Sequence, residues 1–174
     1  MASLDVGKPQ AIEWIKKNFK KGDTCLDVGP CNGKWSDLLE GYLTIDAVEI
    51  YGPNIIKHRL AEKYRHVYNA DVRGFKFEHY DLIIFGDVLE HMSVADAQEV
   101  LAYAWDRCTD LIVAVPYEWV NRSHYGNPWE FHIQDDLTPE NMLERYPGLM
   151  PAYITPKYGY YTKKGRASEW KTSD

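Results

Sequence analysis

The 174 residues, with 45% hydrophobic and 26% charged side chains, exclude a disordered chain and predict a single domain over 1–174 without an inserted cap domain. The net charge of −6 argues against a dedicated nucleic-acid binder, and no run reaches the ~20 apolar residues that a membrane span needs. No apolar secretory signal follows Met1. The three cysteines, Cys25, Cys31 and Cys108, are an odd number and lack the spacing of a metal site. We therefore expect a reducing compartment, the cytoplasm.

Helix-like and strand-like segments alternate along the chain, and this alternation predicts an α/β layer fold. In chain order we predict a helix over 9–20, a strand over 23–29, a helix over 34–40, a strand over 43–50, a helix over 53–64, a short strand over 66–70, a strand over 80–86, a helix over 93–107 and a strand over 110–116. A polar and aromatic segment follows over 117–136, and then a short helix over 138–147 and an antiparallel pair of edge strands over 150–155 and 158–164. Pro53 suits the first turn of its helix, and Ser93 suits an N-cap. Five strands separated by helices imply a parallel sheet that is covered on both faces.

Four acidic residues stand at or near the carboxyl ends of the first four predicted strands: Asp27, Glu49, Asp71 and Asp87. In an open α/β sheet, ligands bind outside these ends. A row of carboxylates there repels phosphates and accepts hydrogen bonds from hydroxyl and amino groups. The pattern therefore favours a nucleoside with a cationic tail over a polyphosphate nucleotide.

The turn after the first strand contains Gly29 and Gly33, which let the backbone pass close to a ligand. Three residues rather than four separate these glycines, and Trp35 rather than Ser or Thr follows Lys34, so a phosphate loop of the Walker type is excluded. The Gly-x-Gly-x-x-Gly pattern is also absent, which disfavours a nicotinamide oxidoreductase. For this loop alone, a tight strand-to-helix turn without a ligand is the alternative.

Five segments in order resemble the motifs of class I S-adenosylmethionine-dependent methyltransferases. The segment Leu26–Gly33 (LDVGPCNG) resembles the first motif, Asp-x-Gly-x-Gly-x-Gly, with Cys31 in the place of the middle glycine. Val48–Ile50 resembles the second motif, Asn69–Val72 resembles the third and Tyr80–His91 resembles the fourth. Leu111–Pro116 is similar to the family's fifth strand with its following proline. The resemblance covers about residues 9–164. It implies a Rossmann-like, seven-stranded, mostly parallel sheet of order 3-2-1-4-5-7-6, with helices on both faces and one antiparallel edge strand.

The resemblance also implies a cofactor, S-adenosyl-L-methionine, and the residues that hold it. Glu49 is expected to accept both ribose hydroxyls, Asp71 to accept the adenine amino group, and Asp87 to lie beside the sulfonium and the amino group. The whole cofactor site implied by the motifs comprises Asp27, Gly29, Pro30, Cys31, Gly33, Glu49, Ile50, Asp71, Val72, Gly86 and Asp87.

The methyl acceptor is expected at the aromatic segment Tyr117–His132, because loops at the carboxyl ends of strands bind ligands. The alternative is that Trp119, Trp129 and Phe131 pack the loop against the protein. His132 is the first candidate for a catalytic base, and a structural histidine is the alternative.

Asp87, Glu90 and His91 fall close together on one helical turn, and with His132 they have the ligand atoms that a divalent cation needs. A hard divalent site prefers several converging oxygens, and this segment holds only two acids. We therefore expect no metal. Asp87 is expected to face the methionine end of the cofactor, and Glu90 and His91 are expected to serve the structure.

Together these interpretations predict a methyltransferase that transfers a methyl group to an oxygen or nitrogen of a small-molecule acceptor. One alternative is a non-catalytic, cofactor-binding partner subunit of the same fold, and another is a methyltransferase that acts on a macromolecule. Neither a membrane nor a nucleic acid is an expected partner. Cofactor binding without methyl transfer to any acceptor would favour the non-catalytic subunit.

Overall fold

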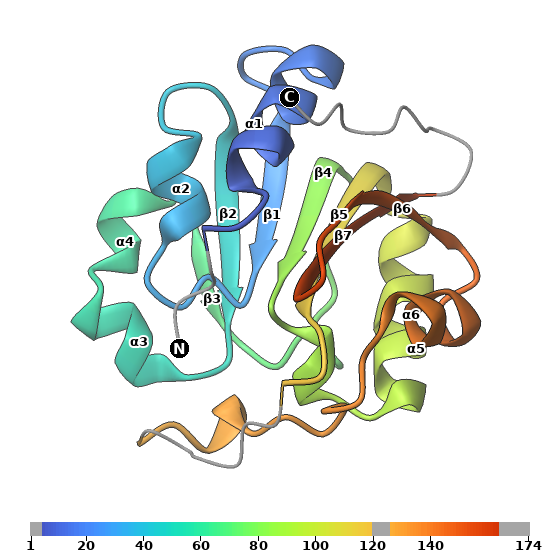
Figure 1. The fold of residues 1–174 in the computed structure, drawn as a ribbon. Helices are drawn as coiled ribbons and strands as arrows, with labels where there is room; N and C mark the ends of the chain where they lie inside the picture. Colours follow the sequence, from blue (N-terminus) through green and yellow to red (C-terminus); the bar gives the residue numbers. More distant parts are fainter. Residues whose placement is uncertain (1–4, 120–125, 164–174) are drawn as a thin grey trace.

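A seven-stranded sheet of order β3-β2-β1-β4-β5-β7-β6 forms the centre of the computed structural model, which describes residues 5–119 and 126–163 (Figure 1). The first five strands pair in parallel, and β7 runs antiparallel to both β5 and β6. The predicted strand order is therefore confirmed, although the antiparallel strand lies one place inside the edge. The strands are β1 (Thr24–Val28), β2 (Thr44–Glu49), β3 (Val67–Asn69), β4 (Tyr80–Gly86), β5 (Cys108–Pro116), β6 (Leu149–Ile154) and β7 (Tyr158–Lys163).

The central strands are continuous apolar runs because both of their faces are buried. Successive residues of β4 and β5 point alternately into two apolar clusters. Ile83 and Leu111 pack into the cluster on one face of the sheet, and Leu82 and Ile112 pack into the cluster on the other. All four side chains are fully buried.

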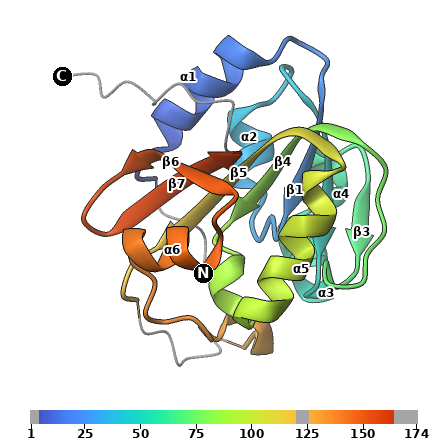
Figure 2. The same ribbon diagram turned by 90° about the vertical axis from the view of Figure 1, so that its right-hand side faces the viewer.

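Helices cover both faces of the sheet, as the resemblance implies (Figure 2). Helices α1 and α2 and the short α4 bury apolar residues in one cluster, and α5 and α6 bury theirs in the other. Ser93 caps α5 as predicted, since its side chain accepts a hydrogen bond from the Asp96 amide at 3.1 Å. The helices are α1 (Lys8–Asn18), α2 (Lys34–Leu38), α3 (Gly52–Lys57), α4 (Leu60–Lys63), α5 (Val94–Trp105) and α6 (Pro139–Arg145), and single 3₁₀ turns form η1 (Leu89–His91) and η2 (Pro128–Glu130).

The helix predicted over 53–64 is wrong as one element, because the chain breaks it into α3 and α4. Arg59 separates the two helices and adopts a left-handed conformation with φ of 53°. The break lets Leu60 and Tyr64 turn into the core, where both are buried, whereas α3 buries no residue fully. Burial of these two side chains therefore overrides the helical continuity that the local sequence favours.

The last two strands form the antiparallel pair that the sequence predicts at this end of the sheet. Gly159 of β7 lies so close to Tyr117 that an added Cβ would stand 1.7 Å from the tyrosine oxygen.

Strand β6 is the edge strand, and its pairing with β7 is interrupted by a register shift between Pro151 and Tyr153. Pro151 is exposed, whereas its neighbour Ala152 is buried.

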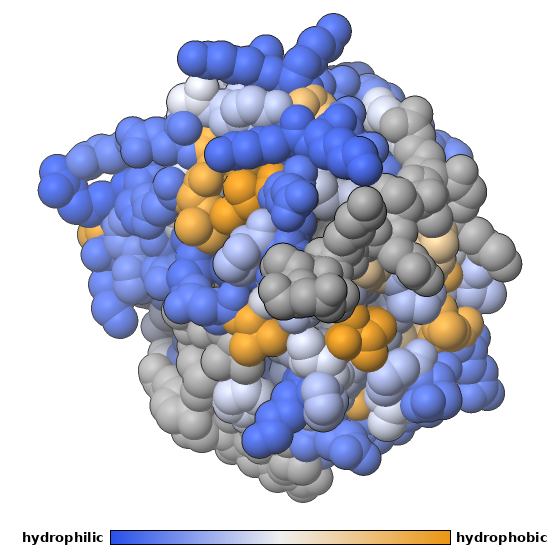
Figure 3. Space-filling model, turned by 45° about the horizontal axis from the view of Figure 1, so that its top comes forward, coloured by the Kyte–Doolittle hydropathy of each residue, from blue (hydrophilic) through white to orange (hydrophobic). Residues whose placement is uncertain are grey.

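On the side of the molecule at the top of Figure 1, the described residues are mostly hydrophilic and form small, separate apolar patches (Figure 3). Such scattered apolar residues are normal on a protein surface. No helix in the described part of the chain is long and apolar enough to cross a bilayer.

Candidate cofactor and acceptor site

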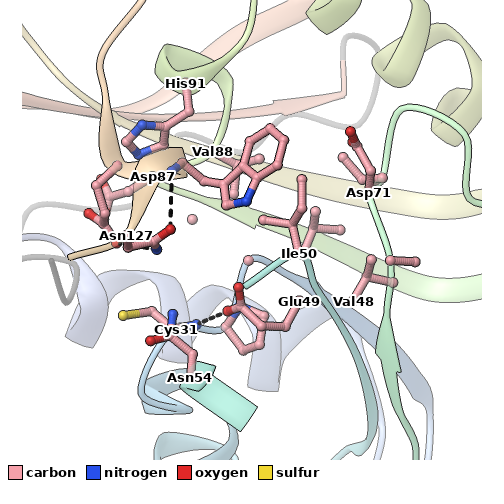
Figure 4. Close-up of a pocket in the computed structure, with 18 of the residues that line it drawn as sticks. Cys31, Val48, Glu49, Ile50, Asn54, Asp71, Asp87, Val88, His91 and Asn127 are labelled. Carbon is pink, nitrogen blue, oxygen red and sulfur yellow. Dashed lines mark hydrogen bonds between the residues drawn. The ribbon is translucent and has the colours of Figure 1, made fainter. Parts of the chain in front are cut away.

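A cleft of about 930 Å³, including its open mouth, lies at the carboxyl ends of the parallel strands. In an open α/β sheet this is the place where a ligand binds. In the close-up, Asp71 lies on one side of the cleft, Asp87 and His91 lie on the other, and Glu49 stands between them (Figure 4). Nine of the eleven residues expected to bind a cofactor line this cleft: Gly29, Pro30, Cys31, Glu49, Ile50, Asp71, Val72, Gly86 and Asp87.

The two remaining residues, Asp27 and Gly33, do not line the cleft. Asp27 is buried in β1, and the Tyr64 hydroxyl donates to its Oδ2 at 2.6 Å. Its Oδ1 has no hydrogen-bond partner in the described part of the chain, and burial raises the pKa of this carboxyl to about 7. Gly33 directly precedes α2, with φ of 80°, and an added Cβ there would meet the Lys63 side chain at 2.8 Å. Both residues therefore shape the protein beneath the cleft.

The loop between β1 and α2 turns through three left-handed residues, Gly29, Cys31 and Gly33. Cys31, with φ of 50°, replaces the middle glycine of the motif that the loop resembles. The Cys31 amide donates to Glu49 Oε2 at 3.1 Å, so the strained turn points a backbone donor at the neighbouring strand. A left-handed conformation costs a non-glycine residue roughly 1 kcal/mol, and this hydrogen bond helps to offset that cost.

Glu49 ends β2 with a buried carboxylate that backbone groups hold in place. Besides the Cys31 amide, the Tyr51 amide donates to Glu49 Oε1 at 2.8 Å. Burial raises the pKa of Glu49, and the two amide hydrogen bonds oppose that rise. Because each carboxylate oxygen accepts more than one hydrogen bond, the fixed carboxylate can still receive two hydroxyl groups from the cleft.

Asp71 already has an ionic partner. The Arg73 guanidinium donates to Asp71 Oδ2 at 2.5 Å and lowers the pKa of that carboxyl. Arg73 also lies over the Trp129 ring, 5.7 Å from its centroid, and Trp129 belongs to η2 at the mouth of the cleft. The pair is about one-third exposed, so a ligand amino group can compete with Arg73 for the carboxylate at little cost.

Asp87 stands at the opposite end of the cleft, with φ of 56°. The Tyr158 hydroxyl donates to Asp87 Oδ1 at 2.6 Å, whereas Oδ2 is buried without a partner among the described residues. Burial raises the pKa of Asp87 to about 6, and the Tyr158 hydrogen bond and the charge of Lys8 oppose the rise. The indole Nε1 of Trp35, which also lines the cleft, is a second buried polar atom without a partner in the described ranges. The cleft therefore offers an acceptor and a donor that are both unsatisfied, which is unusual for buried polar groups in a native protein.

His132 lies beside His91, with 4.8 Å between the ring centroids, although 40 residues separate them in the chain. His91 lines the cleft, whereas His132 does not. Burial lowers the pKa of His91 to about 4 and also lowers that of His132, so both rings are neutral at pH 7. Glu90 is fully buried next to them, and neither of its carboxylate oxygens has a partner in the described part of the chain. Burial, with the neighbouring Asp87 carboxylate, raises the pKa of Glu90 well above its ordinary value.

Sequence reasoning missed several residues that line the cleft. Trp35 and Asn54 follow the first and second motifs by a few residues, and no spacing rule singles them out. Trp129, expected at the acceptor or in loop packing, lines the cleft, and Arg73 lies over its ring. The resemblance to the third motif ended at Val72, although an arginine directly after it could have been recognised as an ionic partner of Asp71.

No protein-family model matches the chain, and no curated protein sequence is significantly similar to it. Solved structures are similar in fold. An S-adenosylmethionine-dependent methyltransferase from Clostridium acetobutylicum shares 12% identity at a TM-score of 0.70, and the match covers 91% of each chain. The N-methyltransferase NodS from Bradyrhizobium japonicum shares 10% identity at a TM-score of 0.63, over 90% of this chain and 93% of that one. A 1,6-didemethyltoxoflavin-N1-methyltransferase from Burkholderia thailandensis, solved with bound 1,6-didemethyltoxoflavin and S-adenosylhomocysteine, shares 14% identity at a TM-score of 0.68, over 91% of this chain and 78% of that one. At these identities the likeness establishes the fold, which is that of Rossmann-like methyltransferases.

Proposed function

We propose that this protein is an S-adenosylmethionine-dependent methyltransferase that acts on an oxygen or nitrogen of a small molecule. The main support is the pair of unsatisfied groups at one end of the cleft, Asp87 Oδ2 and Trp35 Nε1. An amino acid has an ammonium group that an acceptor binds and a carboxylate that a donor binds. The methionine end of the cofactor is therefore the right chemical partner for this end of the cleft.

The other carboxylates fit the nucleoside end. Glu49, fixed by two backbone amides, is placed to accept both ribose hydroxyls as charge-assisted hydrogen bonds. Asp71, once it exchanges Arg73 for the ligand, accepts from the adenine amino group, and the backbone of Val72 lies beside it in the wall of the cleft. The order Asp71, Glu49, Asp87 along the cleft matches the order of adenine, ribose and methionine (Figure 4).

The protein's part in the chemistry is positioning and electrostatics. The bound cofactor supplies an activated methyl group on a sulfonium, so the transfer needs an acceptor atom held in line with the breaking bond. Asp87 and Glu49 would place negative charge near the cation. His91 in the wall of the cleft, with His132 behind it, marks the acceptor side.

A small-molecule acceptor agrees with one of the similar structures, the 1,6-didemethyltoxoflavin-N1-methyltransferase, which was solved with bound 1,6-didemethyltoxoflavin. The carbonyl groups of Trp119 and Phe131 bind the two histidines, and the exposed aromatic side chains of these two residues provide an apolar surface for such an acceptor. The negative net charge opposes the approach of a polyanionic nucleic acid.

Calorimetry with S-adenosylhomocysteine tests the cofactor site, and release of S-adenosylhomocysteine from S-adenosylmethionine tests turnover against pools of phenols, sugars and amines. We expect one S-adenosylhomocysteine per chain and turnover with at least one pool. Asp87→Asn should weaken binding, whereas Asp106→Asn, a control at the end of α5, should not. Absence of binding would refute the cofactor assignment, and binding without turnover on any pool would favour the non-catalytic subunit.

A further inference from the structure

We propose that Glu90, His91 and His132 form a binding site for one divalent transition-metal ion on the acceptor side of the cofactor cleft. One ligand atom from each of these residues lies within 4.8 Å of the other two. In a tetrahedral site with bonds of 2.0–2.2 Å, the ligand atoms lie roughly 3.4 Å apart. Side-chain rotations that move the ligand atoms by about 1 Å would therefore bring this cluster to the spacing that an ion needs.

The hydrogen bonds of the two histidines fix which nitrogen is free. His91 Nδ1 lies 3.1 Å from the Phe131 carbonyl oxygen, and His132 Nδ1 lies 2.7 Å from the Trp119 carbonyl oxygen. A carbonyl oxygen only accepts, so each Nδ1 must carry the proton. Each Nε2 therefore keeps its lone pair, and a backbone carbonyl bound to the other ring nitrogen is the usual support of a metal-binding histidine.

Glu90 supplies the negative charge. Its side chain is 1% exposed, and both carboxylate oxygens lack a hydrogen-bond partner among the described residues. A buried carboxylate without a partner is costly, and structural carboxylates in proteins normally have one. An ion held between this carboxylate and two neutral imidazoles would satisfy Glu90.

The backbone holds the two halves of the cluster together. The Ile133 and Gln134 amides both donate to the Glu90 carbonyl, at 2.8 and 3.0 Å. The Gln134 side chain donates to the Leu89 and Met92 carbonyls, at 2.8 and 3.1 Å. These bonds fix the segment that carries His132 against η1, which carries Glu90 and His91, so the site is organised before an ion arrives.

Two imidazoles and one carboxylate select a transition ion such as Zn²⁺, Mn²⁺ or Fe²⁺ over Mg²⁺ or Ca²⁺, which prefer oxygen ligands. Three protein ligands leave coordination positions open. Because His91 lines the cleft, an acceptor oxygen can reach such a position, and the ion would lower the pKa of a bound hydroxyl. This role in the chemistry rests on the proposed function, and the acceptor it selects is a hydroxyl compound. The proposal departs from the sequence-based expectation of no metal, and it replaces a proton-accepting His132 with a metal-binding one.

Titration of tag-free, chelator-treated protein with Co²⁺ tests the site, because the visible spectrum of cobalt reports its ligands. We expect one Co²⁺ per chain, displaced by Zn²⁺, and an affinity at least about 10²-fold lower in Glu90→Gln and in His132→Ala. Glu78→Gln and His79→Ala are matched controls, since this second Glu-His pair is exposed and precedes β4, whereas Glu90 and His91 follow it. Both controls should bind Co²⁺ as the unaltered protein does.

Circular dichroism shows whether each variant is folded, and His132→Gln serves if His132→Ala is not. Absence of a cobalt spectrum, or equal affinity in folded variants and controls, would overturn the metal site. The cobalt titration needs no cofactor, so its outcome does not depend on the methyltransferase assignment. Loss of turnover on chelation with unchanged S-adenosylhomocysteine affinity would support the role on the acceptor, and turnover insensitive to chelation would overturn that role.

Discussion

Glu49→Gln separates the ribose contacts of the cofactor from the support that this side chain gives the loop. The substitution keeps the size of the side chain but removes the charge that would strengthen two hydrogen bonds to ribose hydroxyls. A hydrogen bond to a charged group contributes about 1.5–3 kcal/mol, and a neutral amide oxygen can replace one of the two at roughly half that strength. The loss is then about 2.3–4.5 kcal/mol, so we expect the affinity for S-adenosylhomocysteine to fall roughly 40- to 2,000-fold.

The same substitution disturbs the protein itself, because Glu49 accepts hydrogen bonds from the Cys31 and Tyr51 amides. A glutamine has only one acceptor oxygen, so one of these amides loses its partner. Calorimetry at pH 8 with two ligands distinguishes the two effects: S-adenosylhomocysteine and an analogue without the 2′ and 3′ hydroxyls. For the analogue, Glu49→Gln should cost less than about threefold, since the ribose contacts are already gone.

Glu62→Gln is the control, because Glu62 is an exposed residue of α4 that pairs only with Arg59 in the described structure. It should bind both ligands as the unaltered protein does. If Glu49→Gln weakens both ligands equally, the penalty comes from the loop and the ribose assignment is refuted. If it weakens neither, Glu49 has no part in the cofactor site.

Two further predictions concern stability. The folded protein keeps a proton on Asp27 up to its pKa of about 7, whereas the unfolded chain releases it near 3.8, so stability should fall as pH rises from about 4 to about 7. Asp27→Asn should remove this fall, so its Tm should be higher than that of the unaltered protein at pH 8 but not at pH 4. Its affinity for S-adenosylhomocysteine should stay within about threefold. An unchanged pH dependence of stability would contradict the raised pKa of Asp27. Gly159→Ala places a Cβ 1.7 Å from the Tyr117 oxygen and should lower the free energy of unfolding in urea by about 3 kcal/mol or more. Gly74→Ala, where no atom lies within 4 Å of the added Cβ, should change it by less than about 1 kcal/mol, and equal effects would show that β7 moves away freely.

The sheet could be predicted because its signals are local. Continuous apolar runs mark β4 and β5, and the acidic residue at the end of β2 lies where the next loop begins. The break between α3 and α4 could not be predicted, since it depends on Leu60 and Tyr64 reaching a core that other segments build. Propensity along the chain favours one helix there, and tertiary burial decides otherwise.

The candidate site, like the fold, could be predicted from the sequence only in part. Motif positions such as Glu49 and Asp71 were recognisable because a strand delivers each of them to the same edge of the sheet. Whether a motif residue faces the cleft depends on the turn of its backbone, so Asp27 and Gly33, which carry the resemblance, lie outside the lining. The approach of His132 to His91 depends on the hydrogen bonds of Gln134, which join segments over 40 residues apart. No rule of spacing contains that information.

The interruption at Pro151 bears on how copies of this protein behave in a crowded solution. An edge strand exposes unpaired amide and carbonyl groups on which a second chain can add a strand and begin to aggregate. Strand β6 has a proline, which has no amide to offer, and a register shift that bends the edge beside it. The opposite edge is β3, whose three residues are too few to guide a stable intermolecular ladder. Both ends of the sheet are thus closed to self-association, and replacing Pro151 with a β-branched residue would reopen one of them.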